Sequence, residues 1–350
     1  MNIRPPQQQN NRKISRSKVE FRPKGFALVL VLWVLSLLTI MAGSFALTMR
    51  RESAIVAGIK DNAGAVAAAE AGIAVAEMML LHPDQNKRWR TDGNIYQVDF
   101  GNTQIRLRLL SEAGKIDINK ADPHLLLGLM AQVPIEEERQ AKLIGAILDW
   151  RDKDDLLNIE GAEKKEYRDA GLKYQPRNKP FQTVEELQMV LGMDEGAFNW
   201  LEPLITVYSG QAQVNLKLAS ANVLYALPGL DSSLIASYVA ARLESARNGL
   251  PAPEFPASRA MIGGASANET VTIISEARMV DEESAGETSA LATATVAKLD
   301  AAQSTAFDGL PSVPFKVLKW QRNPANEKSL FTNEMNELLV KQYAEPELSD

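Results

Sequence analysis

The chain of 350 residues contains no cysteine and only two histidines, His82 and His124. Without cysteine there can be no disulfide framework, no thiol nucleophile and no thiolate metal site. Two histidines are too few for a multi-histidine zinc site or for most histidine-based acid–base machinery. Hydrophobic residues make up 45% and charged residues 23% of the chain, as in ordinary globular proteins. We therefore expect a folded protein that is not an enzyme.

Acidic residues are almost absent from residues 1–25, which hold seven basic residues and one acid, a net charge of +6. The rest of the chain carries 31 basic and 43 acidic residues, a net charge of −12. Such an acidic body repels the phosphates of nucleic acids. Nucleic-acid binding is therefore disfavoured, whereas hard cations and basic partner surfaces suit this charge.

A run of 24 residues without any charge follows, from Phe26 to Met49. At about 1.5 Å per residue this run forms a helix of about 36 Å, enough to span a hydrocarbon core of about 30 Å. The basic leader predicts that residues 1–25 stay in the cytoplasm while the body crosses the membrane. The alternative is a cleaved signal peptide, but the run exceeds an apolar region of about 7–15 residues and lacks a small-x-small cleavage site.

The helical pattern continues beyond this run. Residues 52–81 are rich in alanine, lack proline and repeat apolar side chains at roughly helical spacing. We expect one continuous helix of about 55 residues, ended by His82-Pro83 because the residue before proline avoids the helical region. The half at 50–82 is amphipathic and should pack on a globular head outside the membrane.

The junction Lys24-Gly25-Phe26 before the apolar run resembles the signature of type IV prepilins and pseudopilins. The resemblance implies that a prepilin peptidase cuts between Gly25 and Phe26 and that Phe26 is then N-methylated. The 25-residue leader is long for this class. Leu30 also stands where pilin-like subunits usually have glutamate. In the family that carboxylate is thought to pair with the terminal amine of an earlier subunit, so its absence suits a subunit that starts the fibre.

The body predicts an α+β fold with a helical insertion. A β-hairpin is expected at 96–100 and 104–110, followed by helical patterns between 119 and 249 and by β-prone segments at 270–280, 289–299 and 314–320. A proline-rich seam lies at 249–256. The predicted divisions are a leader (1–25), a transmembrane half-helix (26–49), a periplasmic half-helix (50–82), a first sheet part (83–118), a helical insertion (119–249), a second sheet part (250–322) and a C-terminal helix and tail (323–350).

The helical insertion contains an internal repeat with an offset of 98 residues. It aligns Ile116-Asp117-Ile118 with Val214-Asn215-Leu216 and also pairs several apolar positions that follow. The second copy, with Leu227-Pro228-Gly229-Leu230, resembles a helix-hairpin-helix unit, whose hairpin amides bind DNA backbone. A membrane-tethered DNA-uptake receptor is therefore the alternative function. Its charge is unsuitable, since Asp231 follows the hairpin and only two basic residues, Lys217 and Arg242, lie near it.

An acidic segment at 149–155 has the densest potential for metal binding in the chain. Asp152, Asp154 and Glu163 fall at the offsets that an EF-hand loop uses for its first, second and bidentate ligands. Leu157 replaces the glycine that an EF-hand requires. Carboxylates on an irregular loop, with Asn178 as a carbonyl donor, favour Ca²⁺ over softer metals. The alternative is a solvated charge run, because basic residues are interleaved with the acids.

The motif order DWRDKDD, GAEKKEY, YQPRNKPF and TVEELQMVLGM is similar to that of the K-type minor pseudopilins of type II secretion systems (general secretion pathway protein K). This resemblance implies a pilin-like fold, in which a long N-terminal helix packs on a small antiparallel sheet, with an all-α insertion of two SAM-like or helix-hairpin-helix-like units. It also implies Ca²⁺ near the insertion. The ligand candidates carried over are Asp152, Asp154, Glu163 and Asn178, with Asp155 weaker because it adjoins Asp154.

The same resemblance implies a location and partners. The expected location is the inner membrane of a Gram-negative bacterium, crossed once, with the N-terminus cytoplasmic and the body periplasmic. The expected partners are the I-type and J-type minor pseudopilins, an H-type subunit as a further candidate, the prepilin peptidase and the inner-membrane assembly platform. The implied role is a structural cap at the tip of a pseudopilus. Besides this role and the DNA-uptake alternative, a third class is an envelope enzyme that uses Asp and Glu.

Overall fold

A computed structural model describes residues 26–256, 269–280, 287–299 and 314–344. The chain divides into two compact units, residues 1–59 and residues 60–350. The leader and the Gly25 side of the predicted cleavage site lie outside the described residues.

Helix α1 (Phe26–Leu80) is one uninterrupted helix of 55 residues, as predicted. In the first unit its described side chains are exposed, including the large apolar residues from Leu28 to Met49. Among the described residues, α1 is the one helix long and apolar enough to cross a membrane. The helix ends before His82-Pro83, where a helical turn would place residue 82 in a conformation that proline disfavours.

In the second unit, the end of α1 packs on the sheet through small side chains. Ala65, Ala69 and Ala76 are fully buried, and the sheet approaches the helix most closely at Gly72. A Cβ atom added to Gly72 would lie 2.3 Å from the Oγ atom of Ser275. The amphipathic half of the predicted helix therefore does pack on the head, and glycine sets the packing distance at this position.

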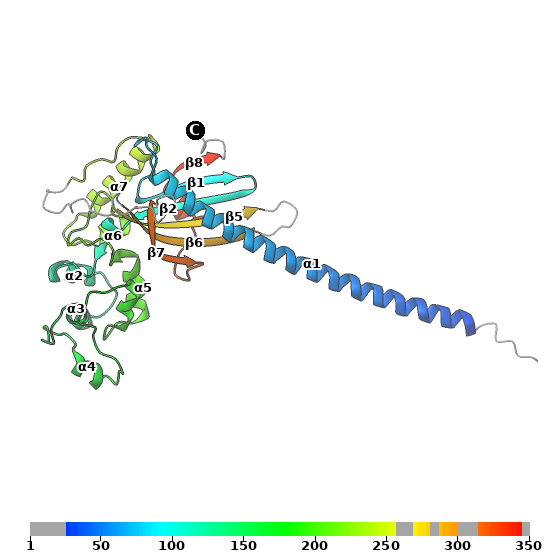
Figure 1. The fold of residues 1–350 in the computed structure, drawn as a ribbon, viewed down its shortest axis with the longest axis horizontal. Coiled ribbons are helices and arrows are strands. Elements are labelled where there is room, and N and C mark those ends of the chain that lie inside the picture. The colour runs from blue at the N-terminus through cyan, green and yellow to red at the C-terminus, as the bar shows by residue number, and fades with distance from the viewer. Residues whose placement is uncertain (1–25, 257–268, 281–286, 300–313, 345–350) are drawn as a thin grey trace, which may run out of the picture. The chain divides into compact units, whose positions relative to one another are not determined.

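The sheet has six strands in the order β7-β6-β5-β2-β1-β8 (Figure 1). Their bounds are β1 Asp92–Phe100, β2 Thr103–Ser111, β5 Thr270–Val280, β6 Glu287–Lys298, β7 Phe315–Arg322 and β8 Leu339–Ala344. Neighbouring strands are antiparallel except β8, which pairs with β1 in parallel. The hairpin and the three later strands agree with the predicted segments, and the predicted antiparallel pairing holds for every neighbouring pair except β1 and β8.

The C-terminal prediction of a helix and tail also needs correction. Within the described part of 323–350, the chain forms the four-residue helix α8 (Asn333–Asn336) and then β8. The segment Leu339-Val340-Lys341-Gln342-Tyr343 is rich in β-prone residues. It extends the sheet beside β1, and local polarity outweighed this signal in the sequence prediction.

The helical insertion lies between β2 and β5, which pair with each other directly. Its elements are the 3₁₀ turns η1 (Glu112–Gly114), η2 (Val184–Met189) and η3 (Glu202–Leu204), helices α2 (Pro123–Met130), α3 (Glu137–Arg151), α4 (Lys164–Asp169), α5 (Glu195–Leu201), α6 (Ala221–Ala226) and α7 (Ser232–Arg247), and the short strands β3 (Ile116–Asp117) and β4 (Ile205–Thr206). The insertion has its own apolar core, which includes Trp150 and Tyr167. It leaves the sheet near residue 112, earlier than the predicted 119.

The internal repeat is visible in matched hydrogen bonds. Helices α2 and α6 are capped by side chains 98 residues apart, Asp122 and Ser220, which accept from the main-chain N–H groups of residues 125 and 223. An arginine of the following helix then donates to the turn before each cap: Arg151 to the carbonyl of Ala121, and Arg242 to that of Ala219. The two copies therefore share one local architecture. Their likeness to SAM or helix-hairpin-helix domains stays a prediction.

Candidate calcium site and insertion junction

The acidic segment forms the loop between α3 and α4. Asp149 lies on the last turn of α3 and is fully buried. Asp152 follows the helix directly, and Glu163, with 7% exposure, precedes α4. The loop therefore brings one carboxylate from each of its ends towards a buried carboxylate on the helix.

Asn158 and Gly161 hold the loop against Asp149. The main-chain N–H of Asn158 donates to Oδ1 of Asp149 at 3.1 Å, and its side-chain amide donates to Asp149 and to Asp152. A Cβ atom at Gly161 would lie 2.1 Å from Oδ2 of Asp149. Only glycine lets the loop backbone come this close to the carboxylate.

Asn178 connects the loop to the segment after α4. Its side-chain amide donates to the main-chain carbonyl of Asp154 and to Oδ1 of Asp155, both at 2.8 Å. Asn178 has a φ of 51°, a left-handed conformation that asparagine tolerates better than most residues. Asp154 is exposed, and its Oδ1 atom accepts from the N–H of Leu156. All five predicted ligand residues thus lie on this loop or contact it.

The electrostatics of the loop are those of an uncompensated anion. Buried oxygen atoms of Asp149, Asp152, Glu163 and Asn178 have no hydrogen-bond partner. Burial, followed by the charges of Asp149, Asp152 and Asp155, raises the pKa of Glu163 from 4.5 to about 7. Burial and the neighbouring acids also raise the pKa of Asp152. A bound cation would satisfy these oxygens and remove the repulsion.

These oxygens suit Ca²⁺, which takes carboxylate, amide and main-chain oxygens together with water. In the part of the chain that the structure describes, however, no three Asp, Glu or His residues already converge as a metal-binding group. Calcium binding therefore stays a prediction, supported by the unpartnered oxygens of Asp149, Asp152, Glu163 and Asn178.

Sequence reasoning did not select Asp149 as a ligand. The signal that could have found it is its position: Asp149 interrupts the apolar stretch from Ala146 to Trp150, so the helix must bury a charge. A buried carboxylate needs a partner, because desolvation of an unpaired charge is strongly unfavourable.

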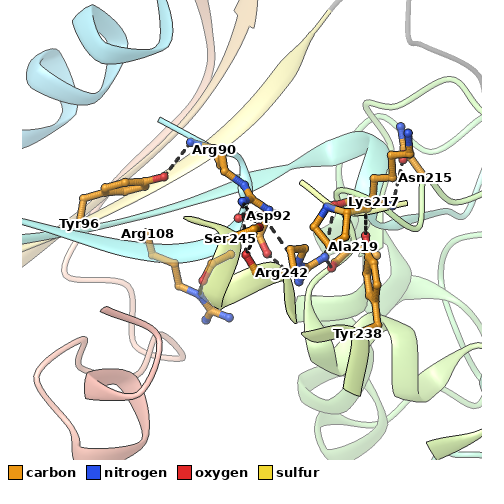
Figure 2. Close-up of polar contacts among 12 residues, drawn as sticks. Arg90, Asp92, Tyr96, Arg108, Asn215, Lys217, Ala219, Tyr238, Arg242 and Ser245 are labelled. Atoms are coloured by element: carbon orange, nitrogen blue, oxygen red, sulfur yellow. Dashed lines mark hydrogen bonds and ion pairs between the residues drawn. The ribbon is translucent and has the colours of Figure 1, made fainter. Parts of the chain in front are cut away.

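A second cluster joins the insertion to the sheet (Figure 2). Arg242 of α7 is 3% exposed and donates to the carbonyls of Ala219 at 2.7 Å and Asp92 at 3.1 Å. Its Nε atom lies 3.6 Å from the Asp92 carboxylate, which also pairs with Arg90 at 2.7 Å. Arg90 donates in turn to Ser245 of α7. Sequence reasoning considered Arg242 only as a charge near a DNA-binding hairpin. In the structure it is a buried residue that links α7 of the insertion to β1 of the sheet.

The hairpin of the DNA-uptake alternative is also engaged internally. Oδ1 of Asp231 accepts from the main-chain N–H groups of Ser233 and Leu234. These are the helix N-terminal amides that a phosphate would otherwise use. The hairpin therefore presents a carboxylate where a DNA-binding unit would need a free anion site.

Comparisons with known proteins agree with the motifs. Residues 104–210 match the family model described as type II secretion system (T2SS), protein K. This chain resembles type II secretion system protein K. The protein K of Klebsiella pneumoniae is 26% identical over 216 residues, which cover 56% of this chain and 66% of that protein. The protein K of Pseudomonas aeruginosa is 27% identical over 164 residues, which cover 44% of this chain and 49% of that protein.

The matches to these K proteins thus span half to two thirds of their length. A chain in the crystal structure of the GspK-GspI-GspJ complex of enterotoxigenic Escherichia coli is 17% identical, with a TM-score of 0.49, and the match covers 76% of this chain and 96% of that chain. The family resemblance predicted from the sequence is confirmed. The relatives named here are components of a secretion system, in agreement with the prediction that the chain is not an enzyme.

Proposed function

We propose that this protein is a minor pseudopilin, a structural subunit of a type II secretion system. The observation that carries the proposal is the match of residues 104–210 to protein K, which begins in β2 and continues into the helical insertion. The fold supports a structural role because the insertion is placed between two adjacent strands. A large domain is thereby added at one end of the sheet while β2 and β5 remain paired.

Helix α1 would anchor the subunit in the inner membrane by a single pass. Its uncharged stretch at 26–49 follows the basic leader, an order that favours a cytoplasmic N-terminus and a periplasmic body. Cleavage between Gly25 and Phe26 and methylation of Phe26 would follow from the prepilin signature. Removal of the leader leaves the apolar helix intact, so the mature subunit keeps its anchor.

The proposed position is the tip of the pseudopilus, where the subunit would initiate assembly for the export of folded proteins across the outer membrane. Leu30 supplies no carboxylate for the terminal amine of a subunit ahead of it, and an unpaired buried charge is unfavourable by several kcal/mol. The insertion would also obstruct a regular subunit stacked above it, whereas a tip is open on one side. The proposed partners below it are the I-type and J-type minor pseudopilins, with an H-type subunit as a further candidate, on the inner-membrane platform.

The test is co-expression of the full chain with its I-type and J-type partners, followed by purification in detergent and measurement of stoichiometry. A tip subunit should give a closed 1:1:1 complex that does not grow with concentration. Open-ended self-association, or many copies of this chain per pseudopilus, would contradict the cap. Failure of the chain to co-purify with either partner would contradict the minor pseudopilin role itself.

We further propose that Ca²⁺ bound by Asp149, Asp152, Glu163 and their loop neighbours orders the loop between α3 and α4. At a free Ca²⁺ concentration 100-fold over Kd, a single site would stabilise the fold by about 2.7 kcal/mol. A chelator should therefore lower the melting temperature of the wild type but not that of an Asp152→Asn/Glu163→Gln variant. Asp169→Asn, at an exposed acid of α4, is the matched control and should keep the response. Equal wild-type melting curves with and without chelator would favour a solvated charge run.

A further inference from the structure

A cavity of about 750 Å³ lies beside the C-terminal end of α1. Its wall combines five segments: the last turn of α1, the connection to β1 with the first part of β1, residues 217–218 before α6, the end of α7 with the residues after it, and β8. Its volume falls within the range of about 300–1,000 Å³ that is typical of ligand pockets. The cavity borders the Asp92–Arg242 junction, and the acidic loop contributes no residue to its wall.

The cavity is basic although the chain as a whole has a net charge of −6. Its wall contains six basic residues, Lys87, Arg88, Arg90, Lys217, Arg247 and Lys341. The one carboxylate in the wall belongs to Asp92, which is buried and paired with Arg90. The cavity therefore has a large excess of positive charge.

Among the residues that the structure describes, four of these cations have no carboxylate partner, although Nζ of Lys341 lies 4.5 Å from the centroid of the Tyr343 ring. Arg88 donates to the main-chain carbonyl of His82, and Arg247 donates to the carbonyls of Glu337 and Leu339. Carbonyl acceptors orient a guanidinium group but do not neutralise it. Within the described ranges, no carboxylate forms an ion pair with Arg88, Arg247, Lys87 or Lys341. Lys217, by contrast, is already paired with Glu254.

The floor of the cavity is made of packed aromatic rings. The rings of Trp89 and Tyr96 stack in parallel with centroids 4.4 Å apart. Nε1 of Trp89 donates to the hydroxyl of Tyr343 at 3.2 Å. The Tyr96 hydroxyl accepts from the main-chain N–H of Arg90 at 2.8 Å (Figure 2). Both rings are buried, Trp89 being 2% and Tyr96 4% exposed, so they support the floor from beneath, and the exposed apolar side chains of the wall are Met78 and Leu250.

We propose that this cavity binds a segment of a partner protein that alternates acidic and leucine-like side chains, with its carboxylates on Lys87, Arg247 and Lys341 and its apolar side chains against Met78 and Leu250. Arginine and lysine form strong, charge-assisted contacts with anionic groups such as carboxylates and phosphates. The concave shape of the cavity favours a peptide over a flat bilayer. The acidic body as a whole disfavours nucleic acid. The site does not depend on the pseudopilin role.

The probe is a fluorescein-labelled peptide of alternating glutamate and leucine, measured by fluorescence anisotropy against the full chain in a neutral detergent. Peptides with serine or lysine in place of glutamate are the controls. The glutamate peptide alone should bind, and its affinity should fall several-fold as salt rises from about 50 to about 300 mM, because the Debye length shortens.

The deciding variant is Lys87→Glu/Lys341→Glu, since both side chains are exposed and hold no other segment in place. It should bind the glutamate peptide at least about tenfold more weakly, a change of about 1.4 kcal/mol. Lys173→Glu/Lys316→Glu makes the same change in net charge at exposed sites elsewhere and should bind as the wild type does.

Three results would overturn the proposal. The first is equal affinity for the glutamate and serine peptides. The second is equal loss of affinity in the two double variants, which would mean that only net charge matters. The third is that the protein binds vesicles of anionic phospholipid but not the glutamate peptide, and that Lys87→Glu/Lys341→Glu abolishes the vesicle binding. That result would mean that the cavity contacts a membrane surface.

Discussion

Replacement of Arg242 by methionine should loosen the insertion from the sheet. Methionine retains the apolar stem but lacks the guanidinium group. In the wild type that group donates to the main-chain carbonyls of Lys217 and Ala219, in the turn before α6, and to that of Asp92 in β1. The Asp92 carboxylate, 2% exposed, would keep Arg90 as its only close cation. The Ala219 carbonyl would lose its arginine donor.

The expected loss follows from this geometry. Removing one partner of a buried ion pair destabilises by about 3–5 kcal/mol. Because Asp92 retains Arg90 at 2.7 Å, we expect the lower end, about 3 kcal/mol. At about 2–4 °C per kcal/mol for a domain of this size class, the melting temperature should fall by about 6–12 °C.

The measurement is calorimetric melting of the full chain in detergent, with Arg139→Met as the control. Arg139 pairs with Asp194 at the surface, where an ion pair contributes about 0–1 kcal/mol. The double variant Asp92→Asn/Arg242→Met should recover part of the loss, because the carboxylate is no longer left underpaired. An Arg242→Met protein that melts within about 2 °C of the wild type, less than 1 kcal/mol, would refute the view that this buried pair fastens the insertion.

Three further predictions concern other parts of the chain. Gly72→Ala should destabilise by about 1–3 kcal/mol by crowding the sheet, whereas Gly58→Ala, which meets open space, should be neutral or slightly stabilising in the same melting assay. Gly25→Ala should leave the leader attached, while N-terminal sequencing of the wild type should start at Phe26. With a chelator present, the folded-state pKa of Glu163, about 7, exceeds its unfolded value, so the folded state holds the extra proton between pH 4.5 and 7. The free energy of unfolding should therefore fall as pH rises through this window. The urea midpoint of Glu163→Gln should change less with pH than that of the wild type. Equal pH profiles for the two proteins would contradict a raised pKa at Glu163.

The site residues were only partly accessible from the sequence. Asp152, Asp154, Asp155 and Glu163 were selected because they lie close together in the chain, and they do lie on one loop, although among the described residues no three of them converge as a metal-binding group. Asp149 was not selected, because its role depends on the inward orientation of α3 and on the close approach of Gly161, neither of which spacing reports.

Features that arise from local chemistry could be predicted from the sequence. The uncharged run at 26–49 and the proline-free, alanine-rich stretch after it determine α1, because every residue in them favours or tolerates a helix. Alternating β-prone segments around Gly101-Asn102 determine the β1–β2 hairpin for the same local reason. The family motifs are likewise local, and they were sufficient for the resemblance to protein K.

How distant segments meet depends on the folded chain and could not be predicted from the sequence. β8 became a strand because it pairs in parallel with β1, more than 240 residues earlier, and that pairing outweighs the polar character of the C-terminal region. Arg242 became a buried link between α7 and β1 because β1 brings Asp92 to it across 150 residues of sequence. The basic cavity likewise combines α1, α7 and β8. Periodicity and spacing describe neighbours along the chain, whereas burial and charge pairing depend on neighbours in space.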